Sequence, residues 1–375
     1  MRTNLIITDV KSYLIPEDPQ IDGWCKLRPN IIVRIETESG LSGWGECYVS
    51  AGHENAICSL VDSLGRSLLG KDASNIRAFT KHAMADFSNQ FISMDVASAT
   101  SGIELAMWDT LGKSLDTPVY QLLGGAYRDE IPLYANMWTE RSWTTEETVK
   151  KALEYVESGF DIVKFYPMWH AKDDADCVAR VKAIRDAIGP DIGLAIDFVR
   201  RVMPEQLRAI CRQLESTNLA WVEDPVPPHH TSTLKWLREH IQQPLLAGES
   251  IGYKHGFADI LTQGALGCIN PDICLGGGLL EMHEIAAIAD THMVTFSPHN
   301  YNSMTVGLSA TANLAAGIRN LAPVEYFPEH AQKLDEVCSG RMVPQNGKLK
   351  LPEGPGFGLS FDDSKMAGFE WCKWD

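Results

Sequence analysis

Residues 219–250 read LAWVEDPVPPHHTSTLKWLREHIQQPLLAGES, and the architecture of the chain can be inferred outward from this stretch. Two short apolar runs, Leu219–Glu223 and Leu245–Glu249, flank a segment with helical periodicity, and each run ends in a glutamate. Strands that alternate with helices pair in parallel through right-handed crossovers. The stretch therefore predicts a strand–helix–strand unit whose two carboxylates lie at the same edge of a sheet.

The same unit recurs through most of the chain. Helical segments such as Asp176–Ile188 separate eight apolar runs. We interpret these runs as strands: Ile131–Met137, Asp161–Tyr166, Ile192–Asp197, Leu219–Glu223, Leu245–Glu249, Cys268–Asp272, Met293–Pro298 and Leu321–Tyr326. Eight such units match an α/β barrel of the TIM type. A doubly wound open sheet is the alternative, but no GxGxxG follows the first run, and Gly276–Gly278 comes too late for that role.

The residues before this repeat have a mixed α and β character. Asn30–Val49 predicts a hairpin around Glu38-Ser39-Gly40. Helices are predicted at residues 55–69, 79–91 and 97–115, and Gly124-Gly125 marks a break. We expect residues 1–127 to form one domain and residues 128–345 the barrel. The Gly- and Pro-rich residues 346–375 are expected to return to the first domain.

The overall composition excludes several classes of partner. The formal charge is −16, which disfavours nucleic acid and an anionic membrane surface. No apolar run is long enough to span a membrane, and the first residues show no signal-peptide core. Nine cysteines without a CxxC pair are typical of buried thiols in a reducing cytoplasm. We therefore expect a cytoplasmic protein.

Titratable residues recur at the carboxyl ends of the predicted strands. From Asp197 onward they are spaced by 23–27 residues, which is about one strand–helix unit. The carboxyl ends of the strands form the catalytic face of such a barrel. The set is Lys164, Asp197, Glu223, Glu249, Asp272, His299 and Glu325.

Three of these residues predict a metal site. Asp197, Glu223 and Glu249 end adjacent strands, so their carboxylates should converge and repel one another. A hard divalent cation such as Mg²⁺ prefers oxygen ligands and would relieve that repulsion. The alternative is three unrelated acids, each paired with a Lys or Arg.

The remaining residues of the set predict acid–base chemistry. Asp272 can hold one ring nitrogen of His299, which raises the basicity of the other nitrogen and suits a general base. Lys164 has three open roles: a base with a depressed pKa, a cation for a substrate carboxylate, or a salt-bridge partner of the neighbouring acids. Glu325 is open between an electrophile, a hydrogen-bonding group for substrate and an acid that only supports its neighbours.

Residues outside this set are candidates for substrate binding. Arg200 follows Asp197 closely, and Trp24 and Lys26 precede the predicted hairpin in a loop that can cover the barrel mouth. His229-His230 is interpreted as a solvent-exposed loop.

Several stretches resemble a known family. They are SGIELAMWDTLGKSLDTPVYQLLGG, WVEDPVPP, AGES, INPDICLGGGL and SPHN, and the chain resembles the enolase superfamily in its mandelate racemase-like branch. The resemblance implies a modified (β/α)₇β TIM barrel under an N-terminal α+β capping domain that the C-terminal tail completes. It implies one Mg²⁺ per active site on Asp197, Glu223 and Glu249, and Asp272–His299 as a base dyad. It also implies a homo-oligomer, either a dimer or an octamer.

Two positions depart from the pattern of this branch. Lys-x-Lys is common after the second strand, but the second Lys is replaced by Tyr166. Asp-x-Asn or Asp-x-His is common after the third strand, but Val199 stands there. The loss of the second Lys disfavours a two-base racemase and leaves Tyr166 as a candidate acid.

The resemblance implies removal of the proton alpha to a carboxylate through an enediolate. With one clear base, we predict a hydro-lyase of carbohydrate acid catabolism that dehydrates a sugar acid to a 2-keto-3-deoxy acid. The alternatives are an epimerase or cycloisomerase on the same scaffold, or a metal-binding homologue that has lost its activity. Specificity is expected in the loops at Asp22–Lys26 and Ser50–His53.

Overall fold

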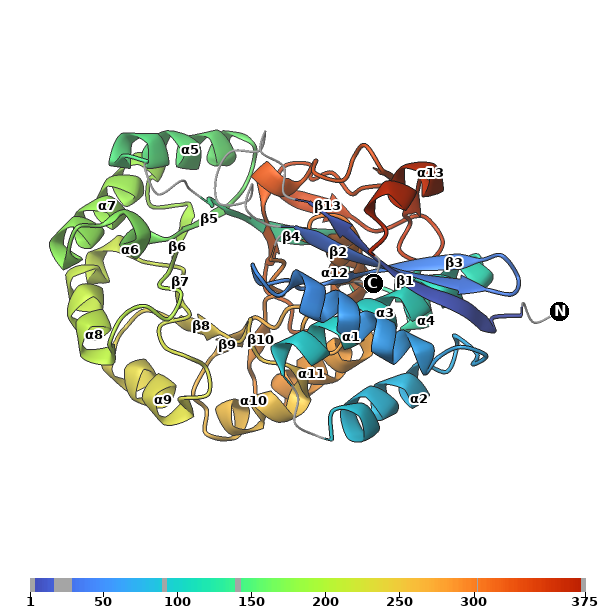
Figure 1. Cartoon of the computed structure of the whole chain (residues 1–375). Helices are drawn as coiled ribbons and strands as arrows, with labels where there is room; N and C mark the ends of the chain where they lie inside the picture. The colour runs from blue at the N-terminus through green and yellow to red at the C-terminus, as the bar shows by residue number, and fades with distance from the viewer. Residues whose placement is uncertain (1–3, 17–28, 90–92, 139–142, 302, 372–375) are drawn as a thin grey trace.

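The computed structural model describes residues 4–16, 29–89, 93–138, 143–301 and 303–371. A ring of helices surrounds a barrel on one side of the molecule, and a three-stranded sheet with its own helices lies on the other side (Figure 1). The predicted hairpin and the alternating strands and helices are both present.

The barrel has eight parallel strands in the order in which they occur along the chain. They are β4 (Glu130–Asn136), β5 (Ile162–Phe165), β6 (Gly193–Asp197), β7 (Trp221–Glu223), β8 (Leu245–Ala247), β9 (Cys268–Ile269), β10 (Thr295–Phe296) and β11 (Val324–Tyr326). The first strand, β4, pairs with the last, β11. Phe296 exchanges backbone hydrogen bonds with Asn320 and Ala322 just before β11, so the ring closes.

Within the described residues, seven long helices connect these strands, one between each consecutive pair. They are α5 (Thr145–Glu157), α7 (Asp174–Ile188), α8 (Pro204–Gln213), α9 (Thr231–His240), α10 (Tyr253–Thr262), α11 (Leu279–Thr291) and α12 (Val306–Ala316), with a short α6 (Pro167–His170) after β5. Eight strands and seven connecting helices are the (β/α)₇β barrel expected from the sequence.

Three predicted strands end two or three residues earlier than expected. Glu249, Asp272 and His299 do not end β8, β9 and β10 but lie in the loops that follow them. Pro271 and Pro298 have no N–H to donate to the ladder, so the regular strands β9 and β10 end before them. Asp272 and His299 lie just beyond these prolines and form an isolated bridge with each other, and Glu249 lies in the loop after β8.

The first part of the chain forms an antiparallel sheet against helices. Its strands are β1 (Ile7–Ile15), β2 (Asn30–Thr37) and β3 (Ser42–Cys47), and its helices are α1 (Glu54–Arg66), α2 (Ile76–Lys81), a π-helical turn (His82–Phe87), α3 (Met94–Ser114) and α4 (Val119–Leu122). A Cβ at Gly43 or Gly45 would lie 2.2 Å or 1.9 Å from a backbone oxygen of α3. Glycine at these two positions lets β3 pack directly on that helix.

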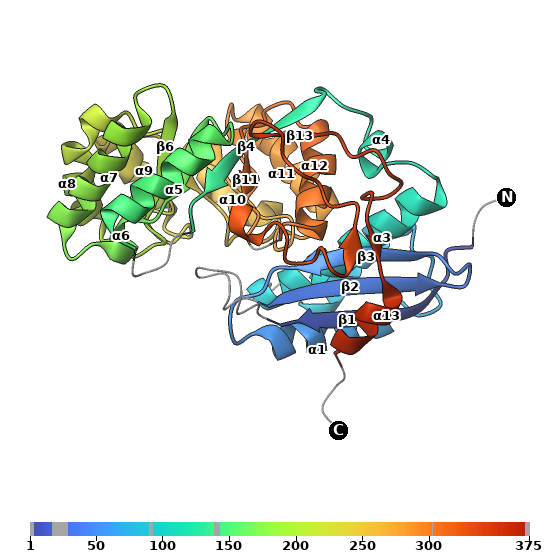
Figure 2. The same ribbon diagram turned by 90° about the horizontal axis from the view of Figure 1, so that it is seen from above.

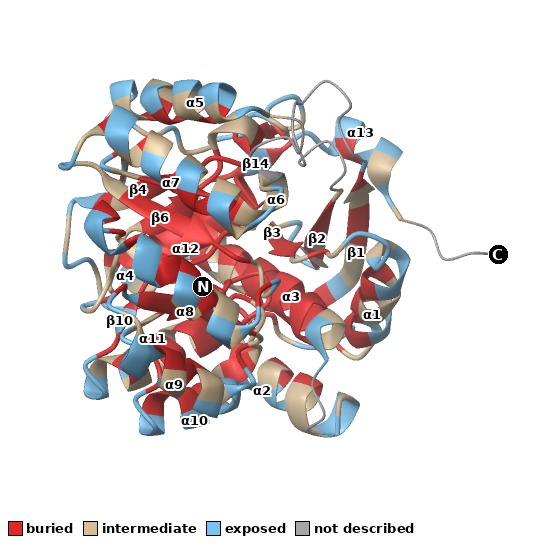
Figure 3. Cartoon of the chain, turned by 90° about the vertical axis from the view of Figure 1, so that its left-hand side faces the viewer, coloured by how far each residue is buried: buried red, intermediate tan, exposed pale blue. Residues whose placement is uncertain are grey.

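Helices α3 and α12 lie between this sheet and the barrel. All eleven residues of α12 are buried, and most of α3 is buried as well (Figure 3). A helix that is buried on every side is covered by neighbouring elements on every side. The two helices therefore join the barrel and the first domain into one packed body.

The C-terminal segment runs from the barrel to the sheet (Figure 2). Strand β13 (Lys348–Lys350) pairs with β4, and β12 (Cys338–Ser339) pairs with β14 (Ser360–Phe361). The short helix α13 (Asp363–Met366) follows, and Trp371 donates its backbone N–H to Ser12 of β1 at 2.9 Å. The tail thus contacts both parts of the molecule.

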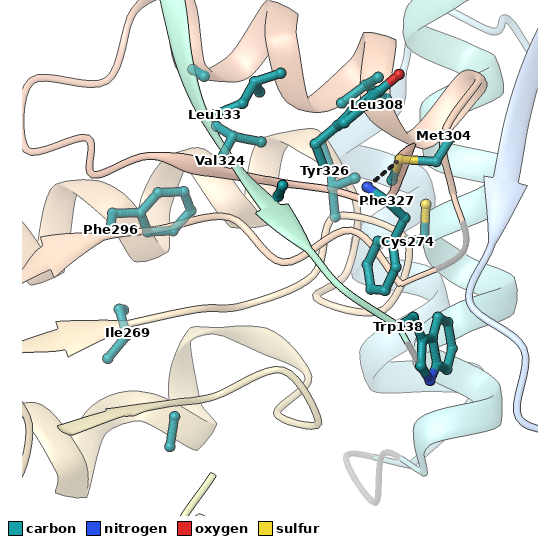
Figure 4. Packing of buried hydrophobic residues seen from close by; sticks show 14 of the residues in the cluster. Leu133, Trp138, Ile269, Cys274, Phe296, Met304, Leu308, Val324, Tyr326 and Phe327 are labelled. Atoms are coloured by element: carbon teal, nitrogen blue, oxygen red, sulfur yellow. Dashed lines mark hydrogen bonds between the residues drawn. The ribbon is translucent and has the colours of Figure 1, made fainter. Parts of the chain in front are cut away.

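The main apolar core is continuous from the barrel to the sheet. Val324 and Leu133 are register partners where β11 meets β4, and Tyr326 and Phe327 continue the packing (Figure 4). The same cluster includes Trp44 of β3.

The described cysteines are all free thiols, and all but Cys268 are buried, in agreement with the prediction from their spacing. Within the described residues, none of the helices is both long and apolar enough to cross a membrane.

Candidate active site

The seven titratable residues predicted from strand spacing meet at the carboxyl end of the barrel. Asp197 and Glu223 are direct register partners of β6 and β7, and Asp272 and His299 are bridge partners in the next loops. All seven side chains are buried. The regular spacing along the chain therefore corresponds to one cluster in space.

The acidic triad can hold a divalent cation. Asp197, Glu223 and Glu249 each offer a carboxylate oxygen, and these three atoms lie within 4.8 Å of one another. Burial raises the pKa of Asp197 to about 6 and that of Glu223 to about 8, because their charged forms lose hydration. Three hard oxygen donors with this excess of negative charge fit the preferences of Mg²⁺.

Lys164 is a buried cation in contact with two members of the triad. Its Nζ atom lies 2.5 Å from Glu223 Oε1, 2.7 Å from Glu325 Oε1 and 3.7 Å from Asp197 Oδ2. Burial by itself lowers the pKa of Lys164, but Glu223 and Glu325 outweigh it and raise the pKa well above its ordinary value. A lysine acts as a base only if its ordinarily high pKa is depressed, so of the three roles left open by the sequence the salt-bridge role fits this geometry.

His299 is held by Asp272 on one side and faces the acids on the other. Its Nδ1 lies 2.7 Å from Asp272 Oδ2, and the Asp272 carboxylate also accepts the backbone N–H groups of Cys274 and Tyr301. Its Nε2 lies 3.0 Å from Glu249 Oε2 and 3.3 Å from Glu325 Oε2. Burial lowers the pKa of His299, but the surrounding carboxylates outweigh it and raise the pKa. The ring nitrogen that Asp272 does not hold thus points toward Glu249 and Glu325.

Glu325 and Tyr166 are joined by an asparagine that the sequence analysis missed. Asn136 Nδ2 donates to Glu325 Oε1 at 2.8 Å and to Tyr166 Oη at 2.7 Å. Burial raises the pKa of the Tyr166 phenol well above its ordinary value, whereas Lys164 and His299 overcome burial and lower the pKa of Glu325. Asn136 ends β4 in register with Lys164. A polar residue at the end of the first barrel run was the signal for it.

Two more residues position Glu223 and were also missed. Trp221 Nε1 donates to Glu223 Oε2 at 2.9 Å, and Asn270 Nδ2 donates to Glu223 Oε1 at 3.1 Å. Trp221 stands two residues before Glu223 on β7, and residues two apart on a strand point to the same face. This spacing was the available signal for Trp221.

Arg200 lies at the mouth of the site. Its Nη1 contacts the Asp224 carboxylate and lies 3.0 Å from Glu249 Oε1. With Tyr48 and Ser50 of the first domain it lines a cavity of about 740 Å³, which His229 also lines. His229 is exposed, as the sequence predicted. The predicted substrate contacts Trp24 and Lys26, and the whole Asp22–Lys26 loop, lie outside the described residues.

Comparison with known families agrees with this geometry. The model of the enolase C-terminal domain-like family matches residues 147–365, and that of the mandelate racemase / muconate lactonizing enzyme N-terminal domain matches residues 23–124. The chain belongs to the enolase superfamily, in its mandelate racemase / muconate lactonizing enzyme branch. The resemblance predicted from the sequence motifs is confirmed.

Relatives in the superfamily include named dehydratases. The chain is 32% identical to a D-xylonate dehydratase of Haloferax volcanii over 95% of this chain and 87% of the relative. It is 32% identical to a D-galactonate dehydratase of Variovorax paradoxus over 90% of each protein.

Solved structures extend the likeness over the full length. The 3,6-anhydro-D-galactonate cycloisomerase of Zobellia galactanivorans matches with a TM-score of 0.86 and 30% identity over 98% of this chain and 99% of that one. An enolase from the Sargasso Sea environmental genome shotgun sequencing matches with a TM-score of 0.91 and 24% identity over 99% of each chain, a likeness of fold alone.

Proposed function

We propose that this enolase superfamily member dehydrates a sugar acid to a 2-keto-3-deoxy acid, after Mg²⁺-dependent removal of the proton alpha to the carboxylate. The observation that carries the proposal is the asymmetry of the site. The imidazole of His299 faces the acidic triad, whereas Lys164 is bound between two carboxylates and Tyr166 has a raised pKa. The sugar-acid dehydratases among the relatives support the same reaction.

One Mg²⁺ per active site would be held by Asp197, Glu223 and Glu249. When bound, it would stabilise the negative charge that develops on the substrate carboxylate in the enediolate. Trp221 and Asn270 keep Glu223 oriented for this role.

His299 performs both proton transfers in this proposal. Its Nε2 takes the α-proton from C2, and Asp272 stabilises the imidazolium that results. The imidazolium then returns a proton to the hydroxyl at C3, and the C–O bond breaks with release of water. The enol that remains takes up a proton at C3 and loses the proton of its C2 hydroxyl, which gives the 2-keto acid, so no external oxidant or reductant is needed.

The other predicted residues would bind and orient the substrate. Lys164 would keep its positive charge between Glu223 and Glu325 and hold both carboxylates in place, and Glu325 would accept hydrogen bonds from the substrate. Tyr166 stands where the branch commonly has a second lysine, the base of the face opposite His299. Trp24, Lys26 and Arg200 are proposed substrate contacts at the mouth.

A cycloisomerase or epimerase is the second candidate. The 30% identity to the Zobellia cycloisomerase over nearly the full length favours it. Both candidates begin with the same proton removal, and they differ in whether water leaves. A homologue without activity is disfavoured because the metal triad, the base dyad and Lys164 are all retained.

The test is turnover of sugar acids in the presence of Mg²⁺. The chelator-treated protein with added Mg²⁺ is incubated with a panel that includes D-xylonate and D-galactonate, and 2-keto acids are measured. Dehydration predicts a 2-keto acid and, in D₂O, deuterium at C3. Deuterium at C2 without loss of water would favour the second candidate, and silence across the panel would contradict the dehydratase proposal.

We also propose the division of the chain and its setting. Residues 1–127 and 346–375 would form the capping unit, and residues 128–345 the catalytic barrel. The protein would act in the cytoplasm as a homo-oligomer, a dimer or an octamer, on a small carboxylate substrate. Light scattering of the purified protein measures the oligomeric state.

A further inference from the structure

Arg200 stands in a backbone conformation that disfavours its residue type. Val199 and Arg200 have φ angles of 48° and 59°, and Asp224 across the site has a φ of 41°. Left-handed backbone is the region of glycine, and a β-branched residue there is a marked outlier. Strain of this kind persists where neighbouring contacts hold it in place. The contacts of the Arg200 side chain with Asp224 and Glu249 lie at this strained segment.

The guanidinium of Arg200 connects two acids of the cluster. Nη1 contacts Asp224 Oδ2 and lies 3.0 Å from Glu249 Oε1, while the Arg200 backbone N–H donates to the Asp224 carbonyl at 2.8 Å. Asp224 is buried, and its other oxygen, Oδ1, has no hydrogen-bond partner among the described residues. Arg200 is therefore the cation that offsets the negative charge of the buried Asp224 carboxylate.

Glu249 is shared between Arg200 and the base. Its Oε1 faces Arg200 and its Oε2 faces His299 Nε2 at 3.0 Å. Glu249 is also one of the three proposed metal ligands. A divalent cation at the triad must take a Glu249 oxygen that already has a positively charged neighbour.

The charge balance of the cluster gives this sharing a consequence. Six buried carboxylates (Asp197, Glu223, Asp224, Glu249, Asp272 and Glu325) surround the basic groups Lys164, Arg200 and His299. A guanidinium keeps its proton at any working pH, so the charge of Arg200 is permanent. Like charges a few ångströms apart repel strongly in a partly dry site. The positive charge of Arg200 thus repels a divalent cation at Glu249. The same charge reduces the electrostatic repulsion between the carboxylates of the site and an anionic substrate.

We propose that Arg200 is a built-in counter-cation of the metal site, which weakens Mg²⁺ binding and strengthens binding of the anionic substrate. The inference rests on the proposed metal site and adds a residue that sets its affinity. Loss of an ordinary residue that supports a metal ligand weakens metal binding, whereas loss of Arg200 is expected to strengthen it.

The experiment measures Mg²⁺ affinity by isothermal titration calorimetry on chelator-treated protein, without substrate. Arg200→Gly removes the charge and suits the left-handed backbone, so it is expected to fold, which thermal unfolding checks. Its Kd for Mg²⁺ should fall by at least about tenfold relative to wild type. Arg200→Lys keeps the charge and should stay within about threefold of wild type. Arg201→Met removes a neighbouring exposed arginine that lies over Trp169 and should change nothing.

A second measurement separates this role from a structural one. For a sugar acid that the wild type turns over, KM of Arg200→Gly should rise while its Mg²⁺ affinity also rises. Unchanged or weaker Mg²⁺ binding in Arg200→Gly would overturn the inference and leave the proposed function standing. A wild type that binds no Mg²⁺ would overturn the metal site and the inference with it.

Discussion

The two sides of the candidate active site use the same strand-end position for different purposes. On one side, His299 is supported by Asp272 at 2.7 Å and presents Nε2 to the triad. On the other side, Lys164 is bound to Glu223 and Glu325 at 2.5 and 2.7 Å. Both groups face carboxylates, but an imidazole has an unperturbed pKa near neutrality and can exchange a proton, whereas an ammonium held between two carboxylates keeps its charge. The difference supports our proposal that His299 is the single base, an arrangement that suits elimination better than racemisation.

Replacing the base should have the largest effect. His299→Asn removes the proton acceptor, so kcat for the sugar acid is expected to fall by at least about 10³-fold. Mg²⁺ affinity should change far less, because His299 is not a proposed ligand. Steady-state kinetics and calorimetry on the same preparation check both. A variant that keeps more than a tenth of the activity would place the base on the Lys164 side.

The acidic triad contacts both His299 and Lys164, and Glu223→Gln tests whether the triad binds the metal. The amide is a poorer metal ligand, and its NH₂ group faces donors, so Mg²⁺ affinity should fall by more than about 100-fold, with activity falling in parallel. Calorimetry with Mg²⁺ measures the affinity. Glu329→Gln, in a partly exposed ion pair with Lys151 outside the site, is the control. Retention of both affinity and activity would remove Glu223 from the metal site.

Lys164→Met tests whether the positive charge of Lys164 stabilises the fold through its buried ion pairs with Glu223 and Glu325. Loss of the amine leaves Glu223 and Glu325 buried without their partner, so the free energy of unfolding should fall by about 3–5 kcal/mol in chelator. Chemical denaturation measures this. Lys151→Met, which breaks a partly exposed pair with Glu329, should cost at most about 1 kcal/mol. An equal loss in both variants would argue against the buried network.

Tyr166→Phe has the smallest expected effect and sharpens the comparison. The phenol accepts one hydrogen bond from Asn136 and has a raised pKa, so it is a poor acid at neutral pH. We expect kcat to fall by less than about tenfold, the range of one lost hydrogen bond. Kinetics across pH 6–9 measure it. A loss of 100-fold or more would make Tyr166 the acid that protonates the leaving hydroxyl.

Much of the site was predictable because the barrel places one strand end in each repeat. The spacing from Asp197 to Glu325 identified the cluster without any knowledge of contacts. Asn136, Trp221 and Asn270 were missed because an amide or an indole does not titrate near neutral pH, so a search for titratable residues at the strand ends passes over them. Their roles depend on hydrogen bonds to Glu223 and Glu325, which are visible only in the folded chain.

The sequence alone determined the barrel, the superfamily and the seven residues at its carboxyl edge, because periodicity and motifs are properties of the chain order. Only the tertiary structure decided which groups are paired. Lys164 and Glu223 are 59 residues apart in sequence and 2.5 Å apart in space. Whether a lysine is a base or a fixed cation depends on burial and on charges a few ångströms away. Those distances are set by how β5, β7 and β11 come together, and no local pattern records them.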